Sequence, residues 1–550
     1  MIVSMRHLDL VCLASEKEAT LEKLRQLGAV HLDLGAAIGA GVAGAKSELE
    51  DAERAVRIVT KAQDEEEEGF REHTVAEVLA IDQDRETLKS EKERLEREIR
   101  IYEPYGDFDP ELAAKLLEKV EGLRDAVGLP EKLPVMRLAK MQEKLARIEN
   151  RIAIDTAKLA ACDSGFILKK FPALKDRLAF AAAKELVEEK GSVAVISGWI
   201  PVTKVDGLST AARDEGWGYL LREPASGEIP PTLIEPPKLF RPVTALFSGL
   251  GISPAYTESD VSVPFLCYFS LFFAMLVGDG GYGAIILALT LYGWKKTSAR
   301  RTLVAKSWLT LLSVFSVVTI LWGLLSNTWF GAGLPFCSEW PTVKWLSGAQ
   351  APNGHEYDNM MFLCFTIGAS HLMLARLWSA ISMLNDRRCL SQFGWAGIVL
   401  FMYIVTNAII GIFPRIPTWS YYIFGVSFVT VFIQAKGIDK GMLFLNTMSV
   451  LGDVISYVRL FAVGLASVKV AANFNDMALS IFNAADSLWL KPLLTIGMVL
   501  VLLIGHGLNF AMAGLSILVH AVRLNTLEFS NHKGITWSGY QFKPFKSVKE

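Results

Sequence analysis

The segment LGDVISYVRLFAVGLASVKVAANFN, residues 451–475, decides the fold of this 550-residue chain. It is long and apolar enough to lie inside a bilayer, yet Arg459 stands in its middle. A guanidinium at membrane depth costs roughly 2.5–3.5 kcal/mol on insertion scales, so an intramembrane arginine is a candidate functional residue. Ala462, Ala466 and Asn473 lie within about 60° of the Arg459 direction on a helix. Small side chains there would let another helix approach closely, and that helix should carry the opposite charge.

The bulk composition indicates a soluble part joined to a membrane part. The hydrophobic fraction of 51% and the mean hydropathy of +0.31 suit a membrane protein, whereas 21% charged residues do not suit an all-membrane chain. Most charged residues precede Pro237, and the long apolar runs follow Val261. The net charge of −2 gives no basic balance for binding nucleic acid. Six cysteines without CxxC spacing predict neither a disulfide framework nor a zinc site, and residues 1–11 lack the features of a signal peptide.

The first half of the chain predicts an α+β domain. Residues 5–14 are expected to form a strand, residues 15–28 a helix ended by Gly28, and residues 29–34 a second strand. Residues 191–216 then predict a strand, a turn and a helix that close the globular part. A β-α-β start to a small α+β domain follows from this order.

Two charged helices between these segments predict an elongated antiparallel hairpin. Leu88, Leu95 and Ile99, within residues 74–102, have the spacing of a coiled-coil seam. Residues 136–161 bring apolar side chains at steps of three and four, and a helical tip would join the two helices. A compact helical bundle is the alternative.

A glycine-rich stretch raises the question of nucleotide binding. Gly39, Gly41 and Gly44 match GxGxxG after a predicted strand. A dinucleotide fold needs another strand next, but a charged helix follows, and Ala45 stands before Lys46 where Walker A requires glycine. We therefore favour a flexible turn into a helix.

The second half predicts an all-α domain of about eight transmembrane helices, the last two long and tilted. The sequence GDGG at 278–281 should break residues 261–294 into two short helices. Further spans are expected at 303–327 and 359–384, then one ending at Phe413, one ending at Lys436, and the last two. With this count every basic loop falls on one side, which predicts cytoplasmic termini in the cell (inner) membrane. The residues concerned are Lys295, Lys296, Arg300, Arg301, Arg387, Arg388, Lys436 and Lys440.

Polar residues form a stripe on the last predicted span, residues 488–529. Asn509, Ser516, His520 and Arg523 follow steps of seven, four and three, so they should share a helix face, with Glu528 one turn beyond. An Arg523–Glu528 ion pair or an arginine that snorkels to the interface is the structural alternative. His520 is either a hydrogen-bonded packing residue or part of a hydrated path.

Other polar residues carry weaker hypotheses. Asp279 and Asp453 are expected to be interfacial rather than transporting, and His506 has no predicted role. Ser456 and Tyr457 could serve either packing or a polar inlet.

Arginine suits a fixed charge better than a proton relay, because its pKa exceeds about 12. Facing a carboxylate about 4 Å away at an effective dielectric near 20, it contributes on the order of 4 kcal/mol, or about three pKa units. Burial in lipid alone raises a carboxylate pKa to roughly 8–9. These effects are comparable and opposite, so a carboxylate would keep its ion in lipid and release it beside Arg459.

The second half resembles subunit a of the rotary V/A-type ATPases, called subunit I in bacteria and archaea. The motifs that carry the resemblance occur in order: GWIP at 198–201, PAYTESD at 254–260, FFAMLVGDGGYG at 272–283, GDVISYVRLFAVGLA at 452–466, HAVRLNTLEF at 520–529 and a terminal YQFKPF. They cover most of the chain after Ser197 and are specific as a set.

The resemblance implies a non-catalytic stator subunit that moves H⁺ or Na⁺ without a cofactor or metal. Arg459 would face the carboxylates of a rotating proteolipid c/K ring, Arg523 would be a second arginine, and Glu528 would match the family's acid. His520 stands where the family often has Gln or His. We place these residues in the ion-translocating site: Arg459, Arg523, His520, Glu528, Ser456 and Ser516.

The same resemblance assigns the domains and partners. Residues 1–240 would be a cytoplasmic stalk-binding domain, 241–261 a linker and 262–550 the transmembrane domain. The partners would be the ring, the peripheral stalk E/G subunits, the central-stalk subunit d/C and the bilayer. A soluble half shorter than usual and the cation Lys469 depart from the family pattern, so Lys469 could snorkel or bias which ion enters. A secondary transporter with a regulatory domain, or a scaffold whose arginines only join helices, are the competing functions.

Overall fold

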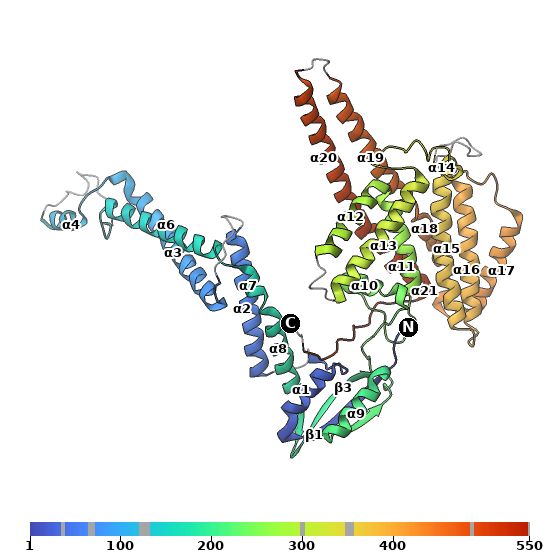
Figure 1. Ribbon diagram of the computed structural model, residues 1–550, viewed down its shortest axis with the longest axis horizontal. Coiled ribbons are helices and arrows are strands. Elements are labelled where there is room, and N and C mark those ends of the chain that lie inside the picture. Colours follow the sequence, from blue (N-terminus) through green and yellow to red (C-terminus); the bar gives the residue numbers. More distant parts are fainter. Residues whose placement is uncertain are drawn as a thin grey trace. The chain divides into compact units, whose positions relative to one another are not determined.

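The computed structural model describes residues 1–34, 39–63, 72–119, 132–296, 303–346, 357–484 and 489–547 (Figure 1). The chain divides into two compact units. The first, here called the membrane unit, consists of residues 1–3 and 227–542. The second, here called the N-terminal unit, consists of residues 4–226 together with the C-terminal residues from 543 onward.

A four-stranded antiparallel sheet forms the centre of the N-terminal unit, in the order β2-β3-β1-β4. Alternate side chains of β1 point to one face, where they pack against α1 and α9, so that face is the core and the other is open. The bounds are β1 (Met5–Leu13), β2 (Glu188–Lys190), β3 (Val193–Pro201), β4 (Gly218–Arg222), α1 (Lys17–Leu27) and α9 (Val205–Glu215).

The expected strand at residues 29–34 is wrong. Gly28 ends α1 in the left-handed conformation, and the chain after it makes only an isolated bridge between His31 and Trp199. Val30 and Leu32 are nevertheless buried in the core of the sheet. Burial of these side chains thus explains the apolar alternation that predicted a strand. The hydrogen-bonded ladder along this edge of β3 is formed by β2.

The glycine-rich stretch is mostly helical. Gly41 and Gly44 lie inside the first turns of α2 (Ala40–Gln63), so their backbone amides are directed along a helix rather than around a phosphate. A Cβ at Gly39 would collide with the carboxylate of Glu185, which gives this glycine a packing role.

The two helices predicted to form the hairpin arm pack against each other, and part of the predicted tip, residues 120–131, lies outside the described residues. α3 (Val75–Tyr102) and α6 (Leu138–Ala160) share a seam in which Leu95, Met141 and Ile148 are buried. Leu88 and Ile99, predicted from the heptad spacing, line the same seam. The remaining helices of this unit are α2, α4 (Pro110–Lys119), α7 (Ser164–Leu168) and α8 (Phe171–Glu185), with short 3-10 turns η1 (Ala14–Glu16), η3 (Glu103–Tyr105) and η4 (Val202–Lys204).

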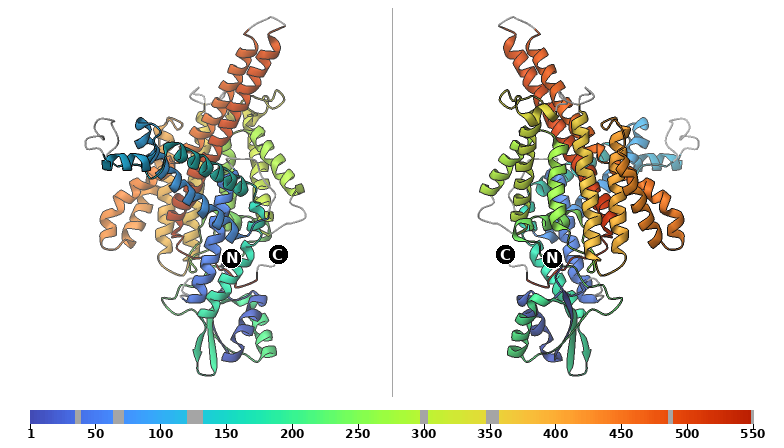
Figure 2. Two further views of the ribbon diagram at one scale, coloured as in Figure 1. Left: turned by 90° about the vertical axis from the view of Figure 1, so that its left-hand side faces the viewer. Right: turned by 90° about the vertical axis from the view of Figure 1, so that its right-hand side faces the viewer.

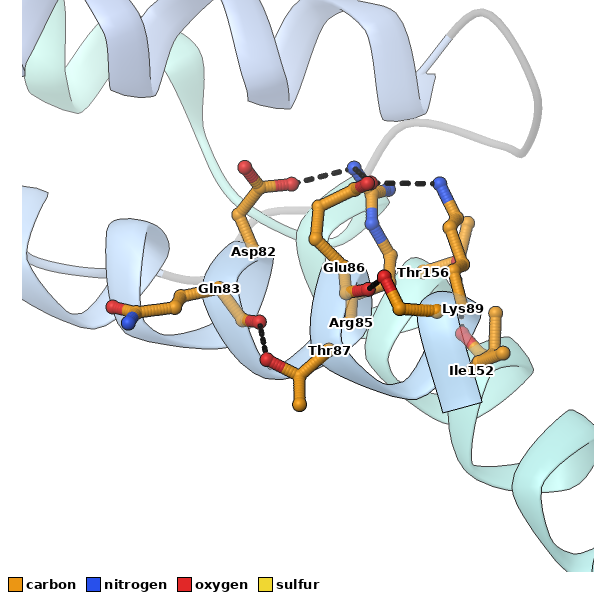
Figure 3. Close-up of polar contacts among 9 residues, drawn as sticks. Asp82, Gln83, Arg85, Glu86, Thr87, Lys89, Ile152 and Thr156 are labelled. Atoms are coloured by element: carbon orange, nitrogen blue, oxygen red, sulfur yellow. Dashed lines mark hydrogen bonds and ion pairs between the residues drawn. The ribbon is translucent and has the colours of Figure 1, made fainter. Parts of the chain in front are cut away.

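Figure 3 shows polar contacts of the arm that are local to single turns, and surface ion pairs such as Lys92–Glu149 and Lys144–Glu91 also join α3 to α6. Arg85 donates to Asp82 at 2.6 Å, and Lys89 donates to Glu86 at 2.9 Å. Each helical pair of this kind contributes only about 0.2–0.5 kcal/mol. The apolar seam therefore holds the arm together, and the charges keep its surface soluble.

The membrane unit is entirely helical in its described spans. Among the described residues, five helical stretches are long and apolar enough to cross a membrane, or six if the bent pair of α11 and α12 is one span. The stretches are Ala305–Ser326, Asp358–Ser382, Cys389–Ile409, Lys440–Phe482 and Lys491–Lys533. The helices are η5 (Lys238–Phe240), α10 (Val243–Leu250), α11 (Ser262–Val277), α12 (Gly280–Lys296), α13 (Leu303–Ser326), α14 (Pro341–Leu346), α15 (Asp358–Ser382), α16 (Cys389–Ile409), α17 (Thr418–Gln434), α18 (Ile438–Ile455), α19 (Val458–Phe482), α20 (Lys491–Ser516) and α21 (Ser530–Lys533).

The predicted count of eight is not confirmed, for two physical reasons. α11 and α12 meet at a bend of 118°, so they can be counted as two short helices or as one broken span. α17 has 17 residues, about 25 Å of helix, which is shorter than the roughly 30 Å of a hydrocarbon core. Arg300 and Arg301, which the topology prediction used, lie outside the described residues.

The bend between α11 and α12 is held by a buried carboxylate. Asp279 is 0% exposed and accepts hydrogen bonds from the backbone amides of Gly281, Phe330 and Gly331, each at 2.8 Å. Its carboxylate caps α12 and ties the bend to the turn that follows α13.

Candidate functional site

Arg459 lies where the helical stretch Lys440–Phe482 is locally tightened. The amides of Tyr457, Arg459 and Leu460 bond to carbonyls three residues earlier, whereas Ser456 still bonds four residues earlier. This short 3-10-like turn joins α18 to α19. It rotates Arg459 away from the direction that an unbroken helix would give it.

The chain after α20 is wound more widely than a regular α-helix. After α20 the chain passes through two π-helical turns, η6 (Ile517–Ala521) and η7 (Leu524–Phe529). In such turns the hydrogen bonds join residues five apart, and they occur frequently at functional sites. Arg523 and Glu528 are five residues apart, so the π geometry brings onto one face two side chains that a regular α-helix would separate by about 140°.

Glu528 joins the two arginines. Its Oε1 lies 3.3 Å from Nε of Arg523 and 3.6 Å from Nη1 of Arg459. The Glu528 side chain is 6% exposed, that of Arg459 26% and that of Arg523 54%. Two positive charges thus share one negative charge, and the cluster keeps a net charge of about +1.

Part of this cluster has unused hydrogen-bonding capacity. Within the part of the chain that the structure describes, Nη1 of Arg459 and Oε2 of Glu528 are buried and have no hydrogen-bond partner. Buried charged groups without such partners are costly. Because the Arg459 side chain as a whole is 26% exposed, its remaining N–H groups can donate to a further carboxylate.

The face of α19 that carries Arg459 is not covered by this chain. Ala462, Ala466 and Asn473, which were predicted to flank the arginine, are all exposed. α19 and α20 lie side by side as a pair in each view (Figures 1 and 2). Most of the apolar surface of Lys491–Lys533 is likewise exposed, since only 11% of its most apolar window is buried. Such a surface needs lipid or another subunit against it.

The structure brings together only part of the predicted site. Arg459, Arg523 and Glu528 form one cluster, as described above. The hydroxyl groups of Ser456 and Ser516 each bond to a carbonyl of their own helix, that of Asp453 at 2.6 Å and that of Met512 at 2.8 Å. His520 lies half-buried in η6, and the described residues give it no hydrogen-bond or ion-pair partner.

Asn509, the first residue of the predicted stripe, is buried and makes its hydrogen bonds away from the arginine cluster. Its side-chain amide donates to the hydroxyl of Tyr282 at 3.0 Å and to the carbonyl of Ser467 at 2.8 Å. The π turns follow Asn509 and shift every residue after them. A common helix face predicted with a constant rotation of about 100° per residue therefore does not apply after Ser516.

A hydrogen-bonded chain continues from Asn509 along α19 and α20. Because the Tyr282 oxygen accepts from Asn509, its proton points to Nδ1 of His506, 2.9 Å away. Nε2 of His506 then donates to the side-chain oxygen of Asn475 at 3.1 Å. Asn475 donates in turn to the carbonyl of Phe330 at 2.6 Å. This chain fastens α19 and α20 to α12 and to the turn after α13, on the C-terminal side of Arg459.

A second polar cluster surrounds Asp453, which lies six residues before Arg459. Asp453 is 3.0 Å from Nε2 of His532, whose Nδ1 accepts from Nε of Arg376 at 3.0 Å. The Asp453 side chain is 32% exposed and is held in place by His532. Close to this cluster in the sequence, the Tyr457 hydroxyl meets Nδ1 of the fully buried His371 at 2.8 Å.

Several of these residues carried no signal in the sequence. His506, Tyr282 and Arg376 are single polar residues in apolar helices, and their partners lie up to 227 positions away in the chain. Only the presence of a polar side chain in an apolar segment could have marked them. Among the described residues, no group of three or more His, Cys, Asp or Glu side chains is placed to hold a metal ion.

The chain is similar to several proteins that are named as subunits of ATP synthases. It is similar to V-type ATP synthase subunit I 1 of Treponema pallidum (strain Nichols), with 29% identity over 99% of this chain and 100% of the relative. It is 31% identical to V-type ATP synthase subunit I of Borreliella burgdorferi over 64% of this chain and 60% of that protein. A-type ATP synthase subunit I of Methanocaldococcus jannaschii is 22% identical over 84% of this chain and 69% of the relative. No protein-family model matches the chain.

Proposed function

Because the chain is a homologue of the V-type and A-type ATP synthase I subunits, we propose that it is the membrane-embedded stator subunit of a rotary ATPase. In this proposal it is a non-catalytic, multi-pass subunit of the cell (inner) membrane with cytoplasmic termini. It would pass H⁺ or Na⁺ to and from a rotating proteolipid c/K ring. Ions would enter through one half-channel and leave through another.

The observation that carries the proposal is the incompletely compensated arginine cluster on an uncovered helix pair. Glu528 faces both Arg459 and Arg523, so a positive charge of about one unit remains. At about 4 Å and an effective dielectric near 20, that charge favours an ionised carboxylate on a neighbouring protein by on the order of 4 kcal/mol. A ring carboxylate that arrives with its ion bound would release the ion there.

The two polar clusters on either side of Arg459 are candidates for the half-channels. Asp453 and His532 belong to the cluster before the arginine, and Ser467 and Asn475 to the one after it. Both clusters contain titratable or hydrogen-bonding groups within otherwise apolar helices, which is typical of ion pathways. His520, Ser456 and Ser516 remain proposed members of this path.

The N-terminal unit would hold the stationary stalks. Its arm, α3 with α6, offers a charged surface over an apolar seam, which suits a rigid attachment for the peripheral stalk E/G subunits. Residues 1–240 are proposed as this stalk-binding domain, residues 241–261 as a linker and residues 262–550 as the ion-translocating domain. The central-stalk subunit d/C is proposed as a further neighbour.

Substitution of Arg459→Ala in the assembled complex tests the central claim. We expect complexes of normal composition in which ATP turnover no longer drives ion uptake into vesicles, because carboxylates would pass the site without releasing their ion. Lys491→Ala, at the far end of the same helix pair, is the matched control and should retain coupling. A variant that fails to assemble would instead support a scaffold role, and full coupling in Arg459→Ala would refute the proposal.

A further inference from the structure

Arg376 lies in the apolar helix α15, where three side chains fix its orientation. Its guanidinium stacks over the ring of Trp395 in α16 at 5.2 Å, and its Nη1 donates to the side-chain oxygen of Gln392 at 3.2 Å. Its Nε donates to Nδ1 of His532 in α21 at 3.0 Å. Stacking together with donation from two nitrogens fixes the plane of a guanidinium group. The orientation of Arg376 therefore determines what its histidine partner can do.

The contact with Arg376 decides where His532 carries its proton. An arginine N–H can only donate, so Nδ1 of His532 must present its lone pair. The proton of the ring then lies on Nε2, which donates to Oδ2 of Asp453 at 3.0 Å. A second proton, on Nδ1, would oppose the Nε–H group of Arg376, so His532 is neutral while this contact lasts. The His532 side chain is 2% exposed, which keeps solvent away from this arrangement.

Asp453 is the accessible end of this series of side chains. Its Oδ2 accepts from His532, whereas its Oδ1 has no hydrogen-bond or ion-pair partner among the residues that the structure describes. A contact that served only to join α18 to α21 would gain more from a buried carboxylate with both oxygens bonded. The Asp453 side chain is instead 32% exposed. One carboxylate oxygen is thus held by the protein, and the other is left for a cation.

We propose that Arg376 is a positioning residue for ion transfer, which acts through His532 to hold the Asp453 carboxylate while its Oδ1 receives the transported cation, H⁺ or Na⁺. The inference rests on the proposed function, because it needs Asp453 to lie on the ion path. It goes further by giving α15 a part in transport that the arginine cluster does not require. The neutral His532 orients the carboxylate and does not itself carry the ion.

The proton position on His532 tests the structural part of this proposal without a transport assay. The full-length protein would be labelled with ¹³C and ¹⁵N in its eight histidines and studied in liposomes at pH 7.5 by solid-state NMR. His532→Gln assigns the signals of this residue by their absence. We expect an unprotonated Nδ1 and a protonated Nε2 in the unaltered protein.

Arg376→Met should change this spectrum. Methionine keeps an unbranched side chain beside Trp395 but has no N–H donor, so the Nδ1 signal of His532 should shift. A protonated Nδ1 in the unaltered protein, or an unchanged Nδ1 signal in Arg376→Met, would overturn the proposal. Arg415→Met replaces an exposed arginine in the loop between α16 and α17. It is the matched control and should leave the histidine spectrum unchanged.

Ion transport in the assembled complex tests the functional part. It is measured as uptake of H⁺ or radioactive Na⁺ into vesicles per ATP hydrolysed. Residues that orient an ion-binding group typically contribute about 10- to 100-fold, so Arg376→Met should lower this ratio about ten-fold or more. Asp453→Asn should lower it at least as far. Because Arg376 acts through Asp453, the double variant should be no worse than Asp453→Asn alone, whereas a product of the two effects would overturn the proposal.

The outcomes separate this inference from the proposed function. Full coupling in Arg459→Ala would refute the proposed function and this inference with it. Loss of coupling in Arg459→Ala together with normal transport in Asp453→Asn would overturn this inference alone. Arg415→Met should transport ions like the unaltered protein. Thermal unfolding verifies that each variant is folded, and the proton position in the unaltered protein does not depend on the stability of Arg376→Met.

Discussion

Glu528 is the residue on which the geometry of the arginine cluster depends. Replacing it by Gln leaves two cations close together without a shared anion. Because Arg459 and Arg523 are both partly exposed, we expect a moderate loss, about 1–3 kcal/mol of unfolding free energy, rather than the 3–5 kcal/mol of a fully buried pair. Thermal unfolding of the purified protein measures this loss.

A double substitution distinguishes repulsion from simple loss of packing. Arg523→Gln together with Glu528→Gln removes one charge of each sign, so part of the stability should return. The double-mutant cycle should give a coupling energy of about 1 kcal/mol between these two residues. A coupling near zero would show that the 3.3 Å contact contributes nothing to the fold.

Asp279 is a second charged residue whose side chain stabilises the fold. Its carboxylate accepts four backbone amides, those of Gly281, Tyr282, Phe330 and Gly331, and it is excluded from solvent. Asp279→Ala would leave these donors buried without partners, at a cost of roughly 3 kcal/mol or more. We expect a large drop in the melting temperature, whereas Asp476→Ala, at an exposed position of α19, should melt like the unaltered protein.

Sequence reasoning identified Arg459, Arg523 and Glu528, but it could not supply their geometry. A charged residue within an apolar segment can be recognised from the sequence alone, because placing it at membrane depth is costly. The partners of Asp279 lie 51 and 52 residues later, in a turn where Phe330 adopts φ +50°. No local pattern in the sequence marks such a contact.

At the scale of elements, regular periodicity was predictable and its interruptions were not. The seam of α3 and α6 follows from Leu88, Leu95 and Ile99, since a heptad pattern reports directly on packing. The π turns η6 and η7 change the phase of the last helix without a glycine or proline to mark them. The rotation between Asn509 and Arg523 therefore differs from that of a regular α-helix, and Arg523 and Glu528 lie closer together than an α-helix allows.

A close approach of two helices fixes the position of α19. A Cβ at Gly464 would lie 2.4 Å from the carbonyl oxygen of Met275 in α11, and one at Gly278 would lie 3.0 Å from the carbonyl oxygen of Gly464. Gly464→Ala should force α11 and α19 apart, cost about 1–3 kcal/mol and displace Arg459. In assembled complexes we expect ion transport per ATP to fall.

The matched control for this prediction is Gly441→Ala. Gly441 is also helical, in α18, and a Cβ there meets nothing within 4 Å. Helix propensity alone should make that variant neutral or up to about 1 kcal/mol more stable. Equal behaviour of the two variants would show that the α11–α19 contact does not position the arginine.

At the scale of the whole molecule, the C-terminal segment belongs to both units. Residues up to Phe542 belong to the membrane unit, and those from Lys543 onward to the N-terminal unit. Phe545 is 4% exposed in the core of the N-terminal unit, and its amide donates to the carbonyl of Val30 at 2.7 Å. Burial of this one side chain contributes about 2 kcal/mol to docking of the segment. The domain prediction, which ended the soluble part near residue 240, did not include this return of the chain.

Docking of this segment should weaken at low pH because of His31. Nδ1 of His31 lies 2.9 Å from the amide nitrogen and 3.0 Å from the carbonyl oxygen of Lys543, and it can accept the amide hydrogen only while Nδ1 itself carries no proton. Burial lowers the pKa of His31, with a smaller opposing effect from its bond to the Lys543 carbonyl and from Asp33, and the Lys543 charge lowers it slightly more. The released state binds a proton near the ordinary value of about 6.5, and the docked state does so only at lower pH. As the pH falls below about 6.5, docking should therefore lose at most about 1.4 kcal/mol per pH unit.

Tryptic cleavage after Lys546 in the full-length protein measures this docking. The rate for the unaltered protein, divided at each pH by the rate for His31→Gln, cancels the pH dependence of the protease. A glutamine side chain at this position cannot gain a proton, so the ratio should rise steadily between pH 7.5 and pH 5.5. A constant ratio would mean that His31 stays neutral throughout and that docking depends on Phe545 alone. In that case Phe545→Ala should release the segment at every pH to the same degree.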